Sequence, residues 1–205
     1  MITWSRAPVV VAAAGMVLVA CGGGGSDAEE AVDVGGVEAP DRAAGDEPAG
    51  TDPEAVRPYI EELLAQYDQV VNEIVIDPSV ARNPEDPLME RYLNLYEPDS
   101  EFAGQLVQGW LERADEGLST RPLDAEHPTS ESAVDGDIPA GTADEISFPY
   151  CVERHYVVHD DAGRQVQRVP EREQPGTGTA VRVEGQWRLR ELTVRSDAAA
   201  CRSTS

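Results

Sequence analysis

The sequence predicts an α+β fold: N-terminal helices packed on a curved antiparallel sheet, preceded by a signal peptide and a disordered tether. Between about residues 52 and 117, apolar residues recur at three- and four-residue steps, the period of amphipathic helices. From residue 146 onward they recur at every second position, the period of strands. Helices followed by consecutive strands are typical of α+β domains.

The first 20 residues have the parts of a lipoprotein signal peptide. Arg6 supplies positive charge, and the apolar run that ends at Ala20, about 14 residues, is too short to span a bilayer comfortably. The stretch Leu18-Val19-Ala20-Cys21 resembles the lipobox of bacterial lipoproteins. That resemblance implies cleavage before Cys21, a diacylglycerol on its thiol, and a protein anchored by lipid on the outer, extracytoplasmic face of the cell membrane. An ordinary secretory signal with an incidental cysteine is the alternative.

Residues 21–51 are rich in Gly, Ala, Pro and acids and contain little to bury, so we expect a disordered acidic tether before a domain at 52–205. A partner-binding tail is the alternative for this segment. The chain carries 39 acids against 16 basic residues, a net charge of −23. Such a domain lacks the electrostatic footprint of a nucleic-acid-binding protein and would be repelled by anionic lipid head groups.

Three cysteines are an odd number for an exported protein. If Cys21 carries lipid, Cys151 and Cys201 remain, and an oxidising compartment favours a disulfide between them. Two free thiols are the competing possibility.

Start and stop residues predict three helices. Thr51 and Glu54 have the spacing of a capping box for a long helix that ends at Asp77-Pro78. A short second helix follows Asp86-Pro87. A third begins after Asp99 or Ser100 and ends near Gly117.

The second half of the chain predicts strands. Residues 123–142 are turn-rich and polar, and Ile146 to Val158 then form one long strand whose even-numbered residues face the core. A weaker strand at 165–169, a loop at 170–178 and a final hairpin at 179–184 and 187–194 follow. In the last strand the apolar positions shift by one residue, which predicts a β-bulge near Arg190-Glu191.

This arrangement resembles the nuclear-transport-factor-2-like family of cone-shaped α+β domains, over about residues 52–201. The resemblance depends on the capped first helix, the helix pair after Asp86-Pro87, the strand around Phe148 to Val158 and the hairpin that contains Trp187. Uncharacterised actinobacterial lipoproteins of that type are similar. The family's enzymatic members imply a carboxylate base inside the cone, but no acid of this sequence could be matched to that role.

A metal site is the first candidate chemistry. Glu153, His155 and His159 share the odd-numbered face of the long strand, but the two histidines would lie roughly 13 Å apart, too far for one ion. We therefore predict no metal site and no cofactor, and expect exposed polar residues on the outer face of the sheet. No Ser, Thr or Cys stands in a nucleophile motif, so no catalytic residue is predicted.

Arg154 interrupts the apolar row of the long strand. A guanidinium on the core-facing row must be paired or hydrogen-bonded. It could form a salt bridge with a helix acid or reach solvent through the twist of the strand. The functional alternative is an anion-receiving group in a pocket walled by Tyr150 and Tyr156. These three residues are the candidate ligand-binding site.

Two function hypotheses follow. The first is a non-catalytic, lipid-anchored domain that binds a small ligand or a protein partner; the second is an isomerase-like or cyclase-like enzyme that uses the cone as its active site. The missing base favours the first. An open cavity with a desolvated acid would favour the enzyme, and a filled cone would favour an interaction surface.

Overall fold

Side-chain caps determine where the three helices begin. In the computed structural model, which describes residues 47–124, 127–195 and 201, the helices are α1 (Pro53–Ile76), α2 (Pro87–Asn94) and α3 (Glu101–Asp115). The predicted caps Asp86 and Ser100 accept hydrogen bonds from the N–H groups of Leu88 and Ala103. The capping box predicted at Thr51 is wrong, because Asp52 caps α1 by accepting from the N–H of Ala55. A 3₁₀ turn, η1 (Pro78–Arg82), follows α1.

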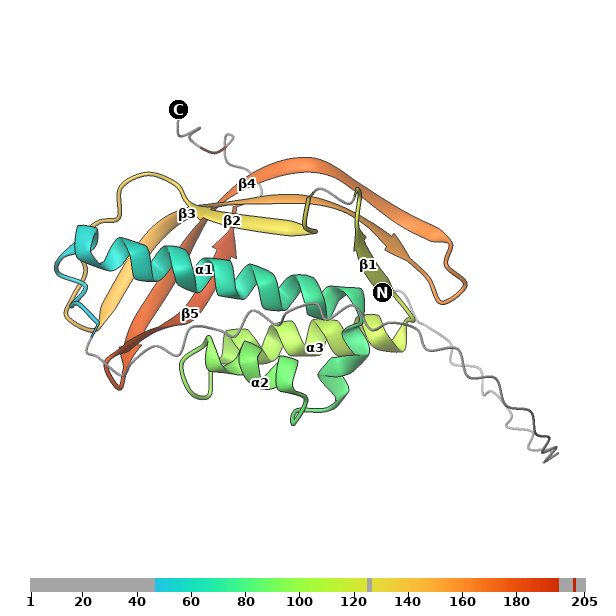
Figure 1. The fold of residues 1–205 in the computed structure, drawn as a ribbon, viewed down its shortest axis with the longest axis horizontal. Helices are drawn as coiled ribbons and strands as arrows, with labels where there is room; N and C mark the ends of the chain where they lie inside the picture. Colours follow the sequence, from blue (N-terminus) through green and yellow to red (C-terminus); the bar gives the residue numbers. More distant parts are fainter. Residues whose placement is uncertain (1–46, 125–126, 196–200, 202–205) are drawn as a thin grey trace, which may run out of the picture. The chain divides into compact units, whose positions relative to one another are not determined.

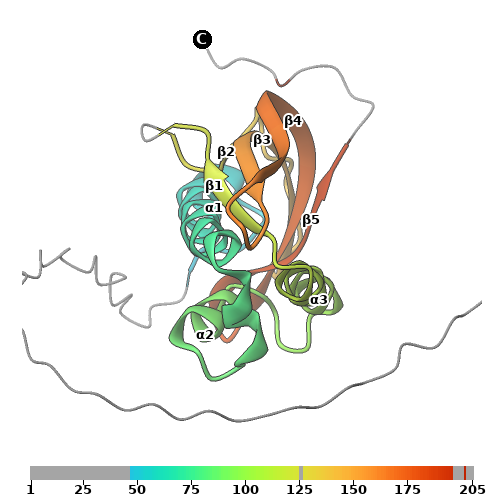
Figure 2. The ribbon, with the colours of Figure 1, turned by 90° about the vertical axis from the view of Figure 1, so that its right-hand side faces the viewer.

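The strands form one antiparallel sheet of five members. They are β1 (Ser119–Pro122), β2 (Ser130–Val134), β3 (Glu145–His159), β4 (Gln165–Val183) and β5 (Gln186–Val194). The order is β1-β3-β4-β5, and β2 also pairs with β3. Both β1 and β2 therefore lie along the same edge of β3, one after the other. The sheet curls into a half-barrel with α1 across its hollow side, as in a cone-like fold, and α2 and α3 beside α1 (Figure 1). Figure 2 shows the same curl from one end.

The long strand behaves as the alternation predicts over its first half. Ile146, Phe148, Tyr150 and Val152 are all buried in the core. They belong to the same hydrophobic core as the apolar side of α1, where Val56, Ile60 and Leu64 are fully buried. This match of a period-2 strand with a helical stripe holds the two layers together.

The prediction of a loop at 170–178 is wrong. This segment belongs to β4, which runs without interruption through Pro170, Gly176 and Gly178. The two glycines lie opposite Tyr150 and Phe148 on β3. A β-carbon at Gly176 or Gly178 would overlap those rings. Glycine is present here because aromatic rings fill the space of the missing side chains, and not because the chain turns.

The predicted bulge in the last strand is confirmed. Thr179 pairs with Glu191, while the next residue, Ala180, pairs with Leu189. Arg190 is the extra residue. Its guanidinium binds Glu97 at 2.9 Å and Glu145 at 2.6 Å, so the bulge aims this side chain at two acids.

The predicted signal peptide, Cys21 and the tether up to residue 46 lie outside the described residues. For residues 47–51 the prediction of disorder is wrong. The N–H of Glu47 donates to Gly185 at 3.0 Å, and the indole N–H of Trp187 donates to the carbonyl of Pro48 at 3.1 Å. Gly50 exchanges hydrogen bonds with the 141–143 segment. These bonds satisfy buried backbone groups, which a polar composition alone does not reveal.

Cys151 on β3 and Cys201 form a disulfide-capable pair. Their Cα atoms lie 5.8 Å apart, within the range that a disulfide spans. Separately, none of the helices in the described ranges is both long and apolar enough to cross a bilayer.

Candidate ligand-binding cavity

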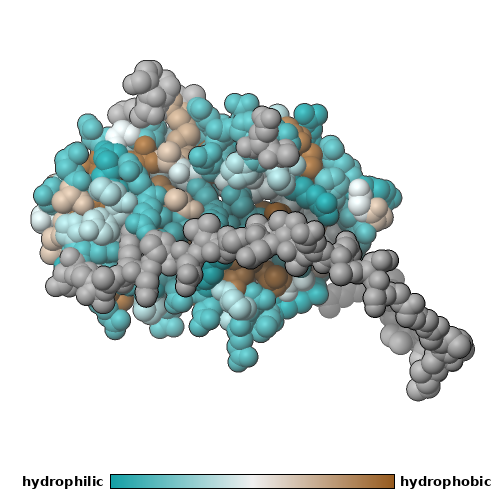
Figure 3. Space-filling model, in the orientation of Figure 1, coloured by the Kyte–Doolittle hydropathy of each residue, from teal (hydrophilic) through white to brown (hydrophobic). Residues whose placement is uncertain are grey.

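A cavity of about 330 Å³ lies between α1, α3 and the sheet. The helices supply mostly apolar and aromatic walls, and the strands supply most of the polar groups. The lining residues used below are Tyr67 and Asp68 of α1, Trp110 of α3, Ser132 of β2, and Tyr150, Arg154 and Tyr156 of β3. The face of the molecule viewed in Figure 3 is largely hydrophilic, with small apolar areas between polar residues.

All three predicted ligand-binding residues line this cavity. Tyr150 is buried, and Arg154 and Tyr156 are half-buried. A guanidinium N–H of Arg154 donates to the side-chain oxygen of Gln174 on β4 at 3.4 Å. Among the described residues no carboxylate forms an ion pair with Arg154. The proposed salt bridge to a helix acid is therefore not what holds this side chain.

Asp68 is the residue that the sequence prediction missed. Its side chain is buried on α1, where Ser132 of β2 binds both carboxylate oxygens. Burial raises the pKa of Asp68 to about 7 from its ordinary 3.8, against the opposing effect of the Ser132 hydrogen bonds. One signal existed in the sequence: Asp68 follows the buried Ile60 and Leu64 at four-residue steps, so it lies on the apolar face of the helix.

The buried tyrosines of the cavity stay neutral. Desolvation raises the pKa of Tyr150 to about 12 and that of Tyr67 further. Both hydroxyls therefore remain available as hydrogen-bond donors at any physiological pH. The positive charge of Arg154 partly opposes the shift of the Tyr150 pKa.

Polar side chains of α1 hold β2 in place as one wall of the cavity. The Asn72 amide donates to the carbonyl of Ser130 at 2.9 Å and accepts from its N–H at 3.0 Å. The hydroxyl of Thr129 also donates to Asn72. Farther along, Arg57 donates to the carbonyl of Gly136 at 2.9 Å. β2 has a neighbouring strand on one side only, so the backbone N–H and C=O groups of its outer edge need other partners. The side chains of α1 supply them.

The prediction for the polar face of β3 needs correction at His155. Instead of lying exposed on the outer face, His155 is 7% exposed. The register of β3 against β4 shifts between Arg154 and Tyr156, so a bulge at His155 breaks the alternation on which the prediction relied. Its ring contacts Asp124, in the loop between β1 and β2. Glu153 and His159, also predicted to be exposed, are half-buried and do not contact Asp124 through any hydrogen bond or ion pair among the described residues.

No protein family and no curated protein matches this chain. Several solved structures are similar to this chain at low sequence identity. The intermembrane-space region of a chloroplast protein has a TM-score of 0.44 and 11% identity, covering 67% of this chain and 95% of that one. A structure from Catenulispora acidiphila has a TM-score of 0.43 and 12% identity, covering 69% and 91%. A protein of unknown function with a cystatin-like fold from Nostoc punctiforme has a TM-score of 0.35 and 14% identity, covering 68% and 91%. These values are too low to carry an argument about function.

Proposed function

We propose that this chain is a lipid-anchored extracytoplasmic domain that binds a small molecule in its cavity, and that it resembles actinobacterial lipoproteins of the nuclear-transport-factor-2-like type. The lipobox at Cys21 supports the anchor, and the curled sheet with helices in its hollow supports the fold type. The cavity supports the binding role. At about 330 Å³ it falls at the small end of known ligand sites, so its occupant is a small compound.

The observation that carries the proposal is the guanidinium of Arg154 at the wall of a cavity that aromatic and apolar side chains also line. Its hydrogen bond within the protein is a long one, to the neutral Gln174. A partly buried cation gains strongly from a charge-assisted hydrogen bond to an anion. Buried tyrosine hydroxyls beside it can donate further bonds. The ligand that fits these walls has an apolar body and one carboxylate or similar acceptor group.

A charge-matched ligand pair tests this proposal. The probes are 4-phenylbutyrate and its primary amide, which have the same apolar body, with binding followed by ligand-observed NMR. The carboxylate should bind more tightly than the amide, and Arg154→Gln should remove that preference. Arg172→Gln is the matched control, because Arg172 lies opposite Arg154 on β4, is exposed and does not line the cavity. Equal binding of acid and amide to the unaltered chain, or an unchanged preference in Arg154→Gln, would refute the proposal.

An enzyme of the isomerase type is the second candidate, because Asp68 is a desolvated acid in an open cavity with a pKa of about 7. Such a group is suited to proton transfer near neutral pH. Both of its oxygens are bound to Ser132, however, which is also the arrangement of a structural tie between α1 and β2. We therefore place binding first.

Asp68→Asn distinguishes the two candidates. Asparagine keeps the shape of the side chain and can still accept from the Ser132 N–H and donate to its hydroxyl. A binding domain should retain its affinity for 4-phenylbutyrate in this variant. An enzyme should instead catalyse proton exchange at the carbon next to the carbonyl of a 3-oxosteroid or cyclic ketone probe, and Asp68→Asn should abolish that exchange. Deuterium incorporation into the probe measures it. Such exchange catalysed by the unaltered chain, and lost in Asp68→Asn, would replace the binding proposal.

A further inference from the structure

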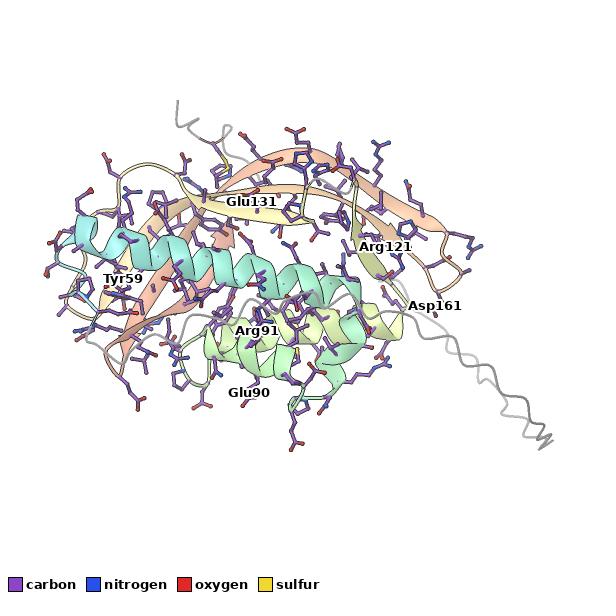
Figure 4. The ribbon with its side chains drawn as sticks, viewed as in Figure 1. Tyr59, Glu90, Arg91, Arg121, Glu131 and Asp161 are labelled. Atoms are coloured by element: carbon purple, nitrogen blue, oxygen red, sulfur yellow. A yellow bond between two sulfur atoms is a disulfide. The ribbon has the colours of Figure 1, made fainter. Side chains whose placement is uncertain are left out.

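Two of the three histidines of this chain meet one aspartate outside the cavity. Pro122, the last residue of β1, pairs with Tyr156, and Ser130, the first residue of β2, pairs with Arg154. The loop between β1 and β2 therefore passes His155, which lies between those two partners on β3. Figure 4 labels Arg121 on β1 and Glu131 on β2, the two strands that this loop joins.

The backbone fixes His155 against the loop. Its N–H donates to the carbonyl of Thr129 at 3.2 Å, and its side chain is 9% exposed. From the loop, Asp124 and His127 reach the imidazole of His155. The backbone N–H of His127 donates to Asp124 at 3.1 Å, so the aspartate is positioned by its own loop.

The donor atoms of these three residues converge. Nε2 of His155 lies 3.1 Å from one oxygen of Asp124, and Nδ1 of His127 lies 2.9 Å from the other. The two imidazole rings are 5.1 Å apart between centroids, and one ligand atom from each residue lies within 4.8 Å of the other two. Around a tetrahedral zinc ion with bonds of about 2.0 Å, neighbouring ligand atoms are about 3.3 Å apart. The ligand atoms of this cluster, all within 4.8 Å of one another, are therefore close to that spacing.

A row of three acids crosses the sheet two residues along β3 from His155. Glu131 pairs with Glu153, and Glu153 pairs with Glu173, so three acids lie side by side across β2, β3 and β4. Glu153 is two residues from His155. Like charges directly opposite one another destabilise a sheet, and a bound cation nearby would lower that repulsion.

We propose that Asp124, His127 and His155 bind one divalent transition-metal ion of the zinc class. Two imidazoles and one carboxylate are a ligand set that such ions accept, with at least one position left to water. The side chains of Asp124 and His127 are 47% and 54% exposed, so the ion can enter from solvent. The site does not depend on the proposed binding function. His155 does not line the cavity, although the neighbouring Thr129 does, so a bound ion would stiffen one wall of it.

Zinc titration of the full chain tests this proposal. The parent protein for this test carries Cys21→Ser, which removes the cysteine outside the Cys151–Cys201 pair as a competing ligand. This protein, metal-free and not reduced, is titrated with Zn²⁺ by calorimetry. One ion should bind per chain, and His127→Ala should weaken binding at least tenfold. His127 is more than half exposed, so its loss should leave the fold intact. His159→Ala is the matched control and should keep the affinity of the parent.

A second measurement separates a metal site from a hydrogen-bonded cluster. Binding to the native state alone raises the melting temperature, so Zn²⁺ should raise it in the parent and in His159→Ala but not in His127→Ala. Cobalt substituted for zinc should show a spectrum without a thiolate charge-transfer band. The absence of saturable one-to-one binding, or equal zinc affinity in His127→Ala and the parent, would overturn the proposal and leave an Asp–His hydrogen-bond cluster.

Discussion

Asp68 on α1 accepts two hydrogen bonds from Ser132 on β2, one from the backbone N–H at 2.5 Å and one from the hydroxyl at 2.9 Å. The two residues are 64 positions apart in the chain. This contact ties the long helix to a strand at the edge of the sheet and places a buried acid at the wall of the cavity. It therefore bears on both the stability of the fold and the chemistry of the site.

The pH dependence of stability should change in Asp68→Asn. The pKa of Asp68 is raised in the folded state, from 3.8 to about 7, so the folded protein holds this proton more tightly than the unfolded chain. The resulting stability is complete below pH 4 and is lost as the pH rises through 7. Between pH 5 and 8 the loss is about 3 kcal/mol, as an upper figure from 1.36 kcal/mol per pKa unit.

Urea unfolding at pH 5 and at pH 8 measures this contribution. Other carboxylates titrate in both proteins, so the informative quantity is the difference between the parent and Asp68→Asn. The parent should lose more stability than the variant as the pH rises. The same change in both proteins would mean that Asp68 has an ordinary pKa.

Gly178→Ala should destabilise the domain. A methyl group there would overlap the ring of Phe148, which is fully buried and cannot move without disturbing the core. Overpacking of this kind costs about 1–3 kcal/mol. Gly104→Ala is the control, because nothing lies within 4 Å of its new methyl group on α3. That change should stabilise the helix by about 0.5–1 kcal/mol. Thermal unfolding of both variants checks the pair, and a neutral Gly178→Ala would contradict the packing argument.

Cys151 and Cys201 should be oxidised to a disulfide when the chain is made in an oxidising compartment. Their sequence separation is 50, and closing a loop of that length stabilises a protein by about 4 kcal/mol in the chain-entropy model, with strain ignored. The denatured, unreduced protein should therefore alkylate at neither cysteine, and reduction should make both reactive. Intact-mass measurement distinguishes the two states. Two alkylated residues before reduction, at Cys151 and Cys201, would show free thiols instead.

Cys21 should carry the lipid anchor when the chain is made in a bacterium that processes lipoproteins. The expected product starts at Cys21 and has the added mass of a diacylglycerol. Cys21→Ala should lack that mass and leave the detergent phase on phase partitioning. Recovery of the unaltered protein with a free thiol at Cys21 would contradict the lipobox prediction.

Local patterns determined much of this fold in advance. Asp86-Pro87 begins α2 and Ser100 caps α3, both where the sequence predicts. The alternation of apolar residues from Ile146 to Val152 correctly assigns the inner face of β3. The shifted apolar positions near Arg190 correctly predict the bulge. These features depend on neighbours a few residues apart, and the sequence displays such neighbours directly.

Only the tertiary structure decided the chemistry. Asp68 is one acid among 39 until β2 meets α1, and its burial, not its identity, shifts its pKa. His155 and Asp124 are 31 residues apart, and a bulge that no local pattern reveals turns the histidine toward the loop. Likewise, Gly176 and Gly178 read as a turn until the opposing aromatic rings are in place. Local patterns in the sequence located the three helices and most of β3 and β5, but not β1, β2 or the middle of β4. The partners of each polar side chain depend on which distant segments pair, because desolvation and ligand geometry are properties of the assembled surface.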